Sequence, residues 1–449
     1  MLVNDIRAVA YSIAQNPLRR ASHIISTLSI RMLCIVLLFA SQATAQPVLQ
    51  QDSVAKNTLS FQEAKARLMR ANLSLLATYY NINIAKAGVI QAKVWANPYF
   101  VFNGDLYSNE ENEYFNFRNQ HLLQIEQTFS YAGKHTNTVK LARVGVEMAE
   151  KQMEDVLRSL LFEMGNTYSE LAALQAKQIL YQQVIFSYDR LMAATRKQLE
   201  VGAISLTEAL RLESEYVTVK TDAVANYNEK EKVISDLRVL LRYPADTTFF
   251  VEQKMPLIAQ EFDVQALSEQ AVAIRPDVQA KKIDKKYAER NLKLQHSNSV
   301  PDLKLAYQPR DRGSNYVRPY QGFNIEFNLP LFDRNQGAIK AAEFNVKKSE
   351  LEFDQIENQV RNEVVAAYNR YRSSNSGLAN YKPEFLNQLN DLNKSTNENF
   401  QKRNIGLLQF IDQQRIFILT NIQMIELRKQ YLNNVNELNF TIGTTLIDN

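Results

Sequence analysis

The sequence predicts a mainly α-helical protein with a small β part, built from one unit that occurs twice. Apolar residues recur at spacings of three and four over two stretches of more than about 60 residues, and two pairs of short segments alternate apolar with polar residues. The whole pattern returns after about 200 residues. Only 12 glycines and 11 prolines occur in 449 residues, so few turns and long elements are expected.

The N-terminal segment has the features of an export signal. An apolar run, "MLCIVLLFA", follows several arginines, and Ala43-Thr44-Ala45 gives a small-x-small cleavage pattern. A run of about nine residues is too short to cross a bilayer as a helix. We therefore predict that residues 1–45 are a signal peptide, although an uncleaved anchor is an alternative. Cys34, the only cysteine, would leave with it, so the mature chain would form no disulfide.

After this signal the chain divides into two copies of the unit. We predict a first repeat over residues 46–255 and a second over 256–449. The copies are recognised by matching apolar stripes, in which Met153, Leu160 and Tyr168 correspond to Phe353, Val360 and Tyr368. Each copy predicts a helix, two strands, a long helix and a further helix.

The strands of the first copy are expected in "NPYFVFNGDLY" and "LLQIEQTFSY", and those of the second in "VPDLKLAYQP" and "GFNIEFNLPLF". In the last of these, Phe323, Ile325, Phe327, Leu329 and Leu331 point one way. A half-buried soluble sheet alternates in the same way. Export and the flanking helices favour instead a membrane sheet that turns its polar side chains to a pore. The predicted pore-facing positions are Gln124, Glu126, Thr128, Asn324, Glu326 and Asn328.

Each second strand leads through a short turn into a helix that is too long for a compact globule. The periodicity predicts helices over 137–199 and 337–403, each roughly 90 to 100 Å long at 1.5 Å per residue. Pro383 is expected to interrupt the second helix, because proline lacks a backbone donor and clashes with the preceding turn.

The turns before these helices have their own predicted roles. In the second copy the turn is Asp333-Arg334-Asn335, where Asp333 or Asn335 is expected to cap the helix. Gly133 and Gly337 are expected to form the bends themselves.

Each long helix is followed by a reversal at a short tip. In "LEVGAISLTEAL", Gly202 is placed where a left-handed residue is needed, and Ser205 can cap the outgoing helix. In "QKRNIGLLQFID", Asn404 occupies the matching position. Plain helix–helix turns are the alternative to a functional role for both tips.

Several of these segments resemble one known family. "LPLFDRNQGAIKAA", "RPDVQAKK", "VPDL" and "VGAISLTEAL" are similar to the outer membrane factor family typified by TolC, and closest to its heavy-metal cation efflux branch. The resemblance extends from about Leu59 to Leu446. It implies a homotrimer in the cell outer membrane, in which each chain gives four strands to a twelve-stranded barrel and its helices to a periplasmic α-helical barrel. Barrel geometry agrees with three chains. Two chains would form an eight-stranded barrel, whose interior is filled by side chains, whereas three chains form a barrel wide enough to leave a conduit.

The resemblance also implies partners: a periplasmic adaptor and an inner-membrane pump, expected to be of the RND type. The adaptor would dock on the two tips, which comprise Val201, Gly202, Ala203, Ile204, Ser205, Leu206, Arg403, Asn404, Ile405, Gly406, Leu407 and Leu408. Many relatives narrow the entrance with aspartate rings beyond the second tip. This chain has Phe410 and Gln413 there, with Asp412 between them. We hypothesise that these residues form the constriction; a solvated surface acid is the alternative for Asp412.

No motif points to an enzyme, a cofactor or a metal site. His121, His135 and His296 lack metal-ligand spacing, and the formal charge of +4, which comes mostly from the N-terminal segment, forms no basic patch for nucleic acid. The expected function is a passive efflux duct, carrying heavy-metal cations on the strength of the resemblance alone. A type I secretion or multidrug duct of the same fold is an alternative, as is a structural periplasmic coiled-coil or adaptor protein.

Overall fold

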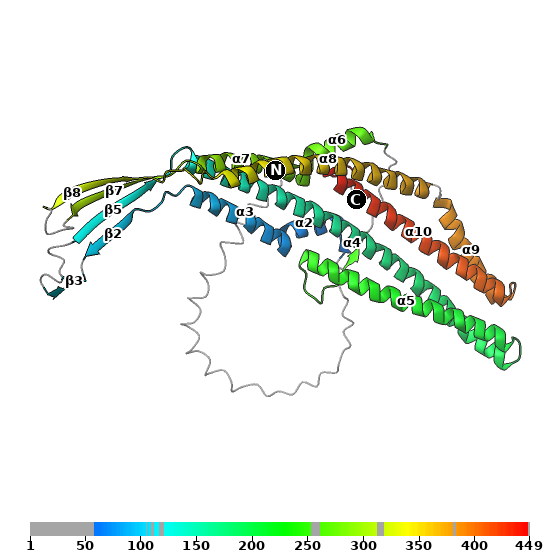
Figure 1. The fold of residues 1–449 in the computed structure, drawn as a ribbon. Helices are drawn as coiled ribbons and strands as arrows, with labels where there is room; N and C mark the ends of the chain where they lie inside the picture. The colour runs from blue at the N-terminus through cyan, green and yellow to red at the C-terminus, as the bar shows by residue number, and fades with distance from the viewer. Residues whose placement is uncertain are drawn as a thin grey trace, which may run out of the picture.

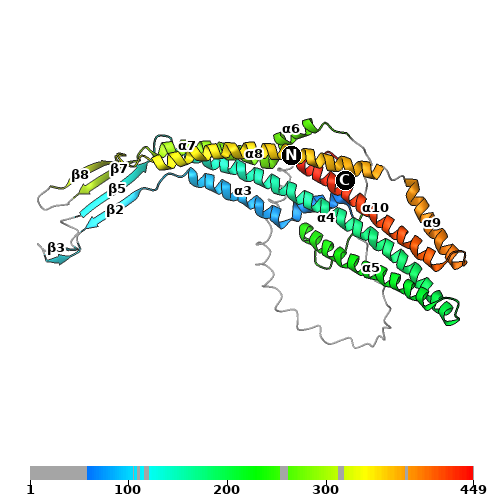
Figure 2. The same ribbon diagram turned by 45° about the vertical axis from the view of Figure 1, so that its right-hand side comes forward.

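The computed structural model describes residues 58–104, 106–108, 112–115, 121–252, 261–311, 318–379 and 383–447. The predicted signal peptide and its cleavage site lie outside these residues. The described chain is elongated, with a β-sheet at one end and two helix tips at the other (Figures 1 and 2).

The elements follow each other in the predicted order, with short additions. The first half of the chain contains β1 (Thr58–Leu59), α2 (Phe61–Ala71), α3 (Leu73–Ala92), β2 (Tyr99–Gly104), β3 (Tyr107–Ser108), β4 (Glu113–Tyr114), β5 (His121–Phe129), α4 (Lys134–Glu200) and α5 (Leu206–Leu241). The second half contains β6 (Phe250–Val251), α6 (Val264–Ile274), α7 (Pro276–Asn298), β7 (Leu303–Asp311), β8 (Tyr320–Glu326), α8 (Gln336–Ala379), α9 (Pro383–Gln401) and α10 (Leu407–Ile442).

The long helix is continuous in the first half and interrupted at Pro383 in the second, as predicted. Helix α4 runs for 67 residues without a break. Its counterpart is divided into α8 and α9, and Pro383 is the first residue of α9, where a missing backbone donor costs nothing. Helix α9 leaves the direction of α8 (Figure 1). None of the helices that the structure describes is both long and apolar enough to cross a membrane.

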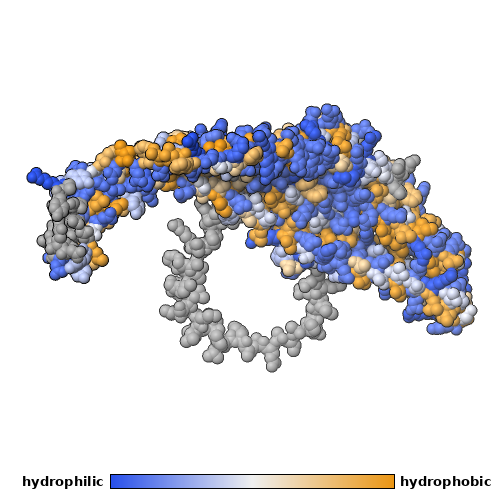
Figure 3. Space-filling model, viewed as in Figure 1, coloured by the Kyte–Doolittle hydropathy of each residue, from blue (hydrophilic) through white to orange (hydrophobic). Residues whose placement is uncertain are grey.

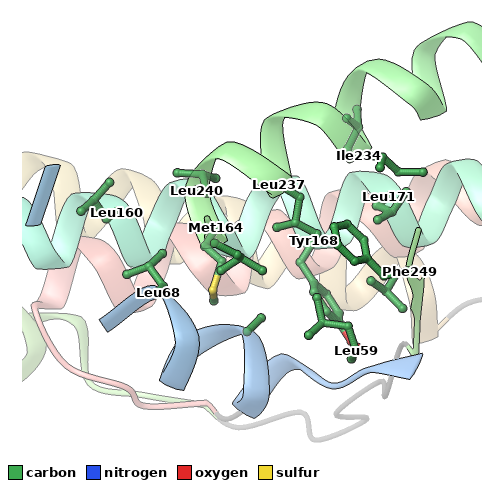
Figure 4. Packing of buried hydrophobic residues seen from close by; sticks show 14 of the residues in the cluster. Leu59, Leu68, Leu160, Met164, Tyr168, Leu171, Ile234, Leu237, Leu240 and Phe249 are labelled. Atoms are coloured by element: carbon green, nitrogen blue, oxygen red, sulfur yellow. The ribbon is translucent and has the colours of Figure 1, made fainter. Parts of the chain in front are cut away.

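Each half has its own core of equivalent construction. In the first, Leu68, Met164 and Leu237 bring α2, α4 and α5 together (Figure 4). In the second, Val364 of α8 and Leu438 of α10 belong to the corresponding cluster, which also includes residues of α6 and α7. The duplicated pattern of the sequence therefore corresponds to duplicated packing.

Towards the tips the two halves share one core. Tyr188 of α4 and Leu212 of α5 lie in the same cluster as Leu389 of α9, Phe410 of α10 and Phe417 of α10. The tip half of the molecule is thus held together by residues from both copies.

A close approach of α4 to α10 requires Gly165. A Cβ built on Gly165 would lie 2.8 Å from two side-chain atoms of Asn436, whereas one built on Gly145 would meet nothing within 4 Å. We expect Gly165→Ala to lower the free energy of unfolding by about 1–2 kcal/mol through overpacking, and Gly145→Ala to raise it by up to about 1 kcal/mol through helix propensity. The unfolding midpoints of the two variants in detergent measure these changes. A Gly165→Ala variant as stable as Gly145→Ala would show that the approach of the two helices tolerates a methyl group.

Candidate functional site

The four main strands form one antiparallel sheet in the order β2-β5-β7-β8. Its register aligns Glu126 with Ala306, and Lys304 with both Thr128 and Glu326. Because side chains alternate along a strand, these positions share one face with Gln124 and Asn324, so five of the six predicted pore-facing positions lie on one face.

The sixth predicted pore-facing position, Asn328, lies outside the sheet, because β8 ends at Glu326. The predicted strand was too long: Phe327, Leu329 and Leu331 also lie beyond β8.

The opposite face of the sheet is apolar and exposed. It includes Phe100, Ile125, Tyr307, Phe323 and Ile325, all of which have large exposed fractions in the single chain. Apolar residues gather over this end of the molecule in Figure 3. A sheet with one polar and one apolar exposed face fits a wall between water and hydrocarbon.

Lys304 lies on the polar face near the start of β7, at the end of the sheet that adjoins the helices, and it was not among the predicted site residues. Its Nζ is 3.5 Å from Glu126 Oε1 on β5 and 3.7 Å from Glu326 Oε1 on β8. The strand pattern marks it as a polar-face position, since it is two residues before Ala306. Its two partners follow only from the register.

The strand-to-helix turns use different residues from those predicted in the second copy. Gly133 has a φ of 78° and precedes α4, as expected for the first copy. Gly337 is not the bend residue, because it lies inside α8; Asn335 takes the left-handed conformation instead, with a φ of 58°. The Asn335 side chain does not cap α8 but donates to the Gln295 carbonyl at 2.8 Å. Asp333 Oδ1 accepts from the Asn335 N–H at 2.9 Å.

Polar contacts attach the strand-to-helix turn of the first repeat to the second repeat of the same chain. Lys134 Nζ at the start of α4 is 2.8 Å from Asp302 Oδ1, just before β7. Asn137 Nδ2 donates to Ser297 Oγ of α7 at 2.7 Å. His135 stacks on Trp95 with ring centroids 4.2 Å apart, which attaches the start of α4 to the segment between α3 and β2.

A buried charge network centres on Arg275, between α6 and α7. The guanidinium donates to Asp277 at 3.0 and 2.5 Å, to Glu363 of α8 at 2.7 Å and to the Thr441 carbonyl of α10 at 3.1 Å. Arg158 of α4 reaches the same Asp277 at 3.3 Å. Burial raises the pKa of Asp277, but hydrogen bonding to Arg275 and the charges of Arg158 and Arg275 outweigh it, so the pKa lies below its usual value.

The first tip has the predicted backbone. Gly202 is left-handed with a φ of 70°, and Ser205 caps α5 by accepting from the Glu208 N–H at 3.3 Å. Glu208 Oε2 in turn accepts from the Ser205 N–H at 2.9 Å, and this hydrogen bonding lowers the pKa of Glu208.

At the second tip the prediction for Asn404 was wrong. Arg403 takes the left-handed conformation, with a φ of 62°, and Gly406 precedes α10 as its N-cap. Both tips present exposed apolar side chains, among them Val201, Leu206 and Leu408.

The predicted constriction residues do not share one environment. Phe410 is buried between Phe400 of α9 and Tyr188 of α4, with ring centroids 4.8 and 6.3 Å away, so its ring does not line an opening in this conformation. Gln413 accepts from Thr396 Oγ1 at 2.6 Å. Asp412 alone is exposed. One turn further on, Arg415 forms an ion pair with Glu215 of α5.

Comparison of the sequence with known families identifies the chain. The model of the outer membrane efflux protein family matches residues 67–232 and 267–444, which is most of the chain. The chain belongs to the outer membrane efflux protein family. Members of this family are channels of the outer membrane with a large periplasmic helical part, and they are not enzymes. No curated protein sequence matches the chain.

Solved channels share the fold of this outer membrane efflux protein. The CmeC outer membrane channel of Campylobacter jejuni superposes with a TM-score of 0.70 at 12% identity, covering 86% of this chain and 87% of CmeC. CusC superposes with a TM-score of 0.64 at 17% identity, covering 91% of this chain and 99% of CusC. The open state of the MtrE channel of Neisseria gonorrhoeae superposes with a TM-score of 0.64 at 14% identity, covering 86% of this chain and 89% of MtrE. At these identities the likeness shows the fold.

Proposed function

We propose that this outer membrane efflux protein is the exit duct of a tripartite efflux system, that it works as a homotrimer, and that its cargo is heavy-metal cations. In this proposal residues 1–45 are removed on export and the two repeats span 46–255 and 256–449. The observation that carries the duct is the placement of an exposed two-faced sheet at one end of the long helices and apolar tips at the other. The metal cargo is proposed from the resemblance of the sequence segments to the heavy-metal branch.

The trimer is supported by edges that a single chain leaves open. Strands β2 and β8 are the outer strands of the described sheet, and an unpaired strand edge is a template for another chain. Helix α5 also exposes Leu210, Val217 and Val224 at heptad spacing, and α9 exposes Leu392. Pairing one side of each chain with the opposite side of the next would close a ring.

The tips support an adaptor that connects the duct to a pump, which we propose to be of the RND type. Val201, Leu206 and Leu408 are exposed apolar side chains at the reversal points, the farthest points from the sheet. Grouped apolar side chains on a surface mark contact sites for other proteins. Asp412, exposed just beyond the second tip, is our remaining candidate for the entrance constriction.

The cargo is tested by growth of a deletion strain on zinc, cobalt, cadmium, copper, silver, detergents and hydrophobic drugs, with the gene restored as the control. We expect selective sensitivity to metals. Sensitivity to drugs and detergents alone would contradict the metal cargo and favour the multidrug duct. Growth unchanged on every compound would contradict the efflux role and favour polypeptide secretion, which the same fold can serve.

A further inference from the structure

The polar face of the sheet contains a fixed charge cluster. Besides the contacts of Lys304, Gln124 Nε2 donates to Glu126 Oε2 at 3.4 Å, and Gln308 Nε2 donates to Gln124 Oε1 at 3.0 Å. Gln308 is itself buried against Gly322, where an added Cβ would lie only 2.3 Å from its Oε1. A line of hydrogen-bonded side chains from Gln308 on β7 to Gln124 on β5 therefore holds Glu126 in place.

The members of the cluster differ in how far they reach into solvent. The Glu126 side chain is 15% exposed, that of Lys304 44% and that of Glu326 63%. Two carboxylates and one ammonium meet at this level in each chain, so the cluster keeps a net negative charge. The ammonium stands between the carboxylates and partly neutralises both.

We infer that Lys304 sets the charge selectivity of the duct by limiting its preference for cations. The inference rests on the proposed function, because the polar face lines a pore only when several chains close a ring. Rings of charged side chains select ions in pores, and such charges act over about 8 Å at physiological salt. A ring dominated by Glu126 and Glu326 favours cations, and Lys304 weakens that field.

Lys304→Met removes the ammonium and leaves the carboxylates. In planar bilayers with a potassium chloride gradient, we expect this variant to raise the ratio of potassium to chloride permeability by about threefold or more, and Glu326→Gln to lower it. Lys304→Arg, which keeps the charge, should match the wild-type protein. Hexamminecobalt(III), added on the side of the strand loops, should block Lys304→Met more strongly than the wild type, which locates the effect in the sheet.

Lys232→Met is the matched control, because Lys232 pairs with Glu229 on α5, outside the sheet. Its permeability ratio should equal that of the wild type. Conducting variants at both Lys304 and Glu326 with unchanged ratios would overturn the inference and leave the duct intact. A wild-type protein that forms no conducting pore would overturn the proposed function, and the inference with it.

Discussion

Replacing Arg275 with methionine is expected to lower the free energy of unfolding by about 3 kcal/mol or more. The Arg275 side chain is only 3% exposed, and its loss leaves Glu363 and the Thr441 carbonyl without their guanidinium donor. Asp277 keeps its ion pair with Arg158. The expected loss of stability therefore lies near the lower end of the range for breaking a buried ion pair. The shift is measured as the unfolding midpoint of the purified protein in detergent.

Arg370→Met provides the matched control for this prediction. Arg370 also makes a two-pronged contact, at 2.8 and 2.6 Å with Glu437, but its side chain is 50% exposed. An exposed pair contributes about 1 kcal/mol or less. Equal shifts for the two variants would mean that burial of the Arg275 network adds nothing to stability.

Placing a carboxylate on a tip is expected to abolish efflux without unfolding the protein. In Val201→Asp, a charge replaces an exposed apolar side chain that we propose to be buried against the adaptor. Burying an unpaired charge costs several kcal/mol, and each 1.4 kcal/mol is a factor of about ten in affinity. We therefore expect at least about a tenfold loss of adaptor binding and loss of resistance in cells that carry the variant.

Val239→Asp makes the same chemical change on α5, the helix that follows the first tip. Val239 is 77% exposed and Val201 is 78% exposed, but Val239 lies at the end of α5 that is far from the tip. This control should keep its resistance. Full resistance in Val201→Asp, with normal protein levels, would exclude the first tip as a docking site.

Much of the fold could be predicted because its signals are local. Periodicity and the repeat located the long helices and the four strands without knowledge of which residues meet. Backbone details were less certain, since the bends at Asn335 and Arg403 lie one or two residues from the predicted Gly337 and Asn404. Periodicity locates a turn but does not fix which of its residues takes the left-handed conformation, and residues other than glycine can adopt it.

Long-range contacts were beyond the sequence pattern. Phe410 was predicted in an opening, but the faces of α9 and α10 that pack together bury it against Phe400. The partners of Lys304 depend on the register of three strands. The network of Arg275 requires a carbonyl 166 residues away.

The shared core of the tip half also sets an order of events during synthesis. Tyr188 and Leu212 complete their packing with Leu389, Phe410 and Phe417, which are made about 200 residues later. Contacts between distant parts of a chain form slowly because the intervening loop must first be closed. The sheet-proximal core of the first repeat can therefore form as soon as that repeat has been translocated, whereas its tip remains an exposed apolar surface until the C-terminal helices arrive. During that interval the nascent protein depends on protection from aggregation.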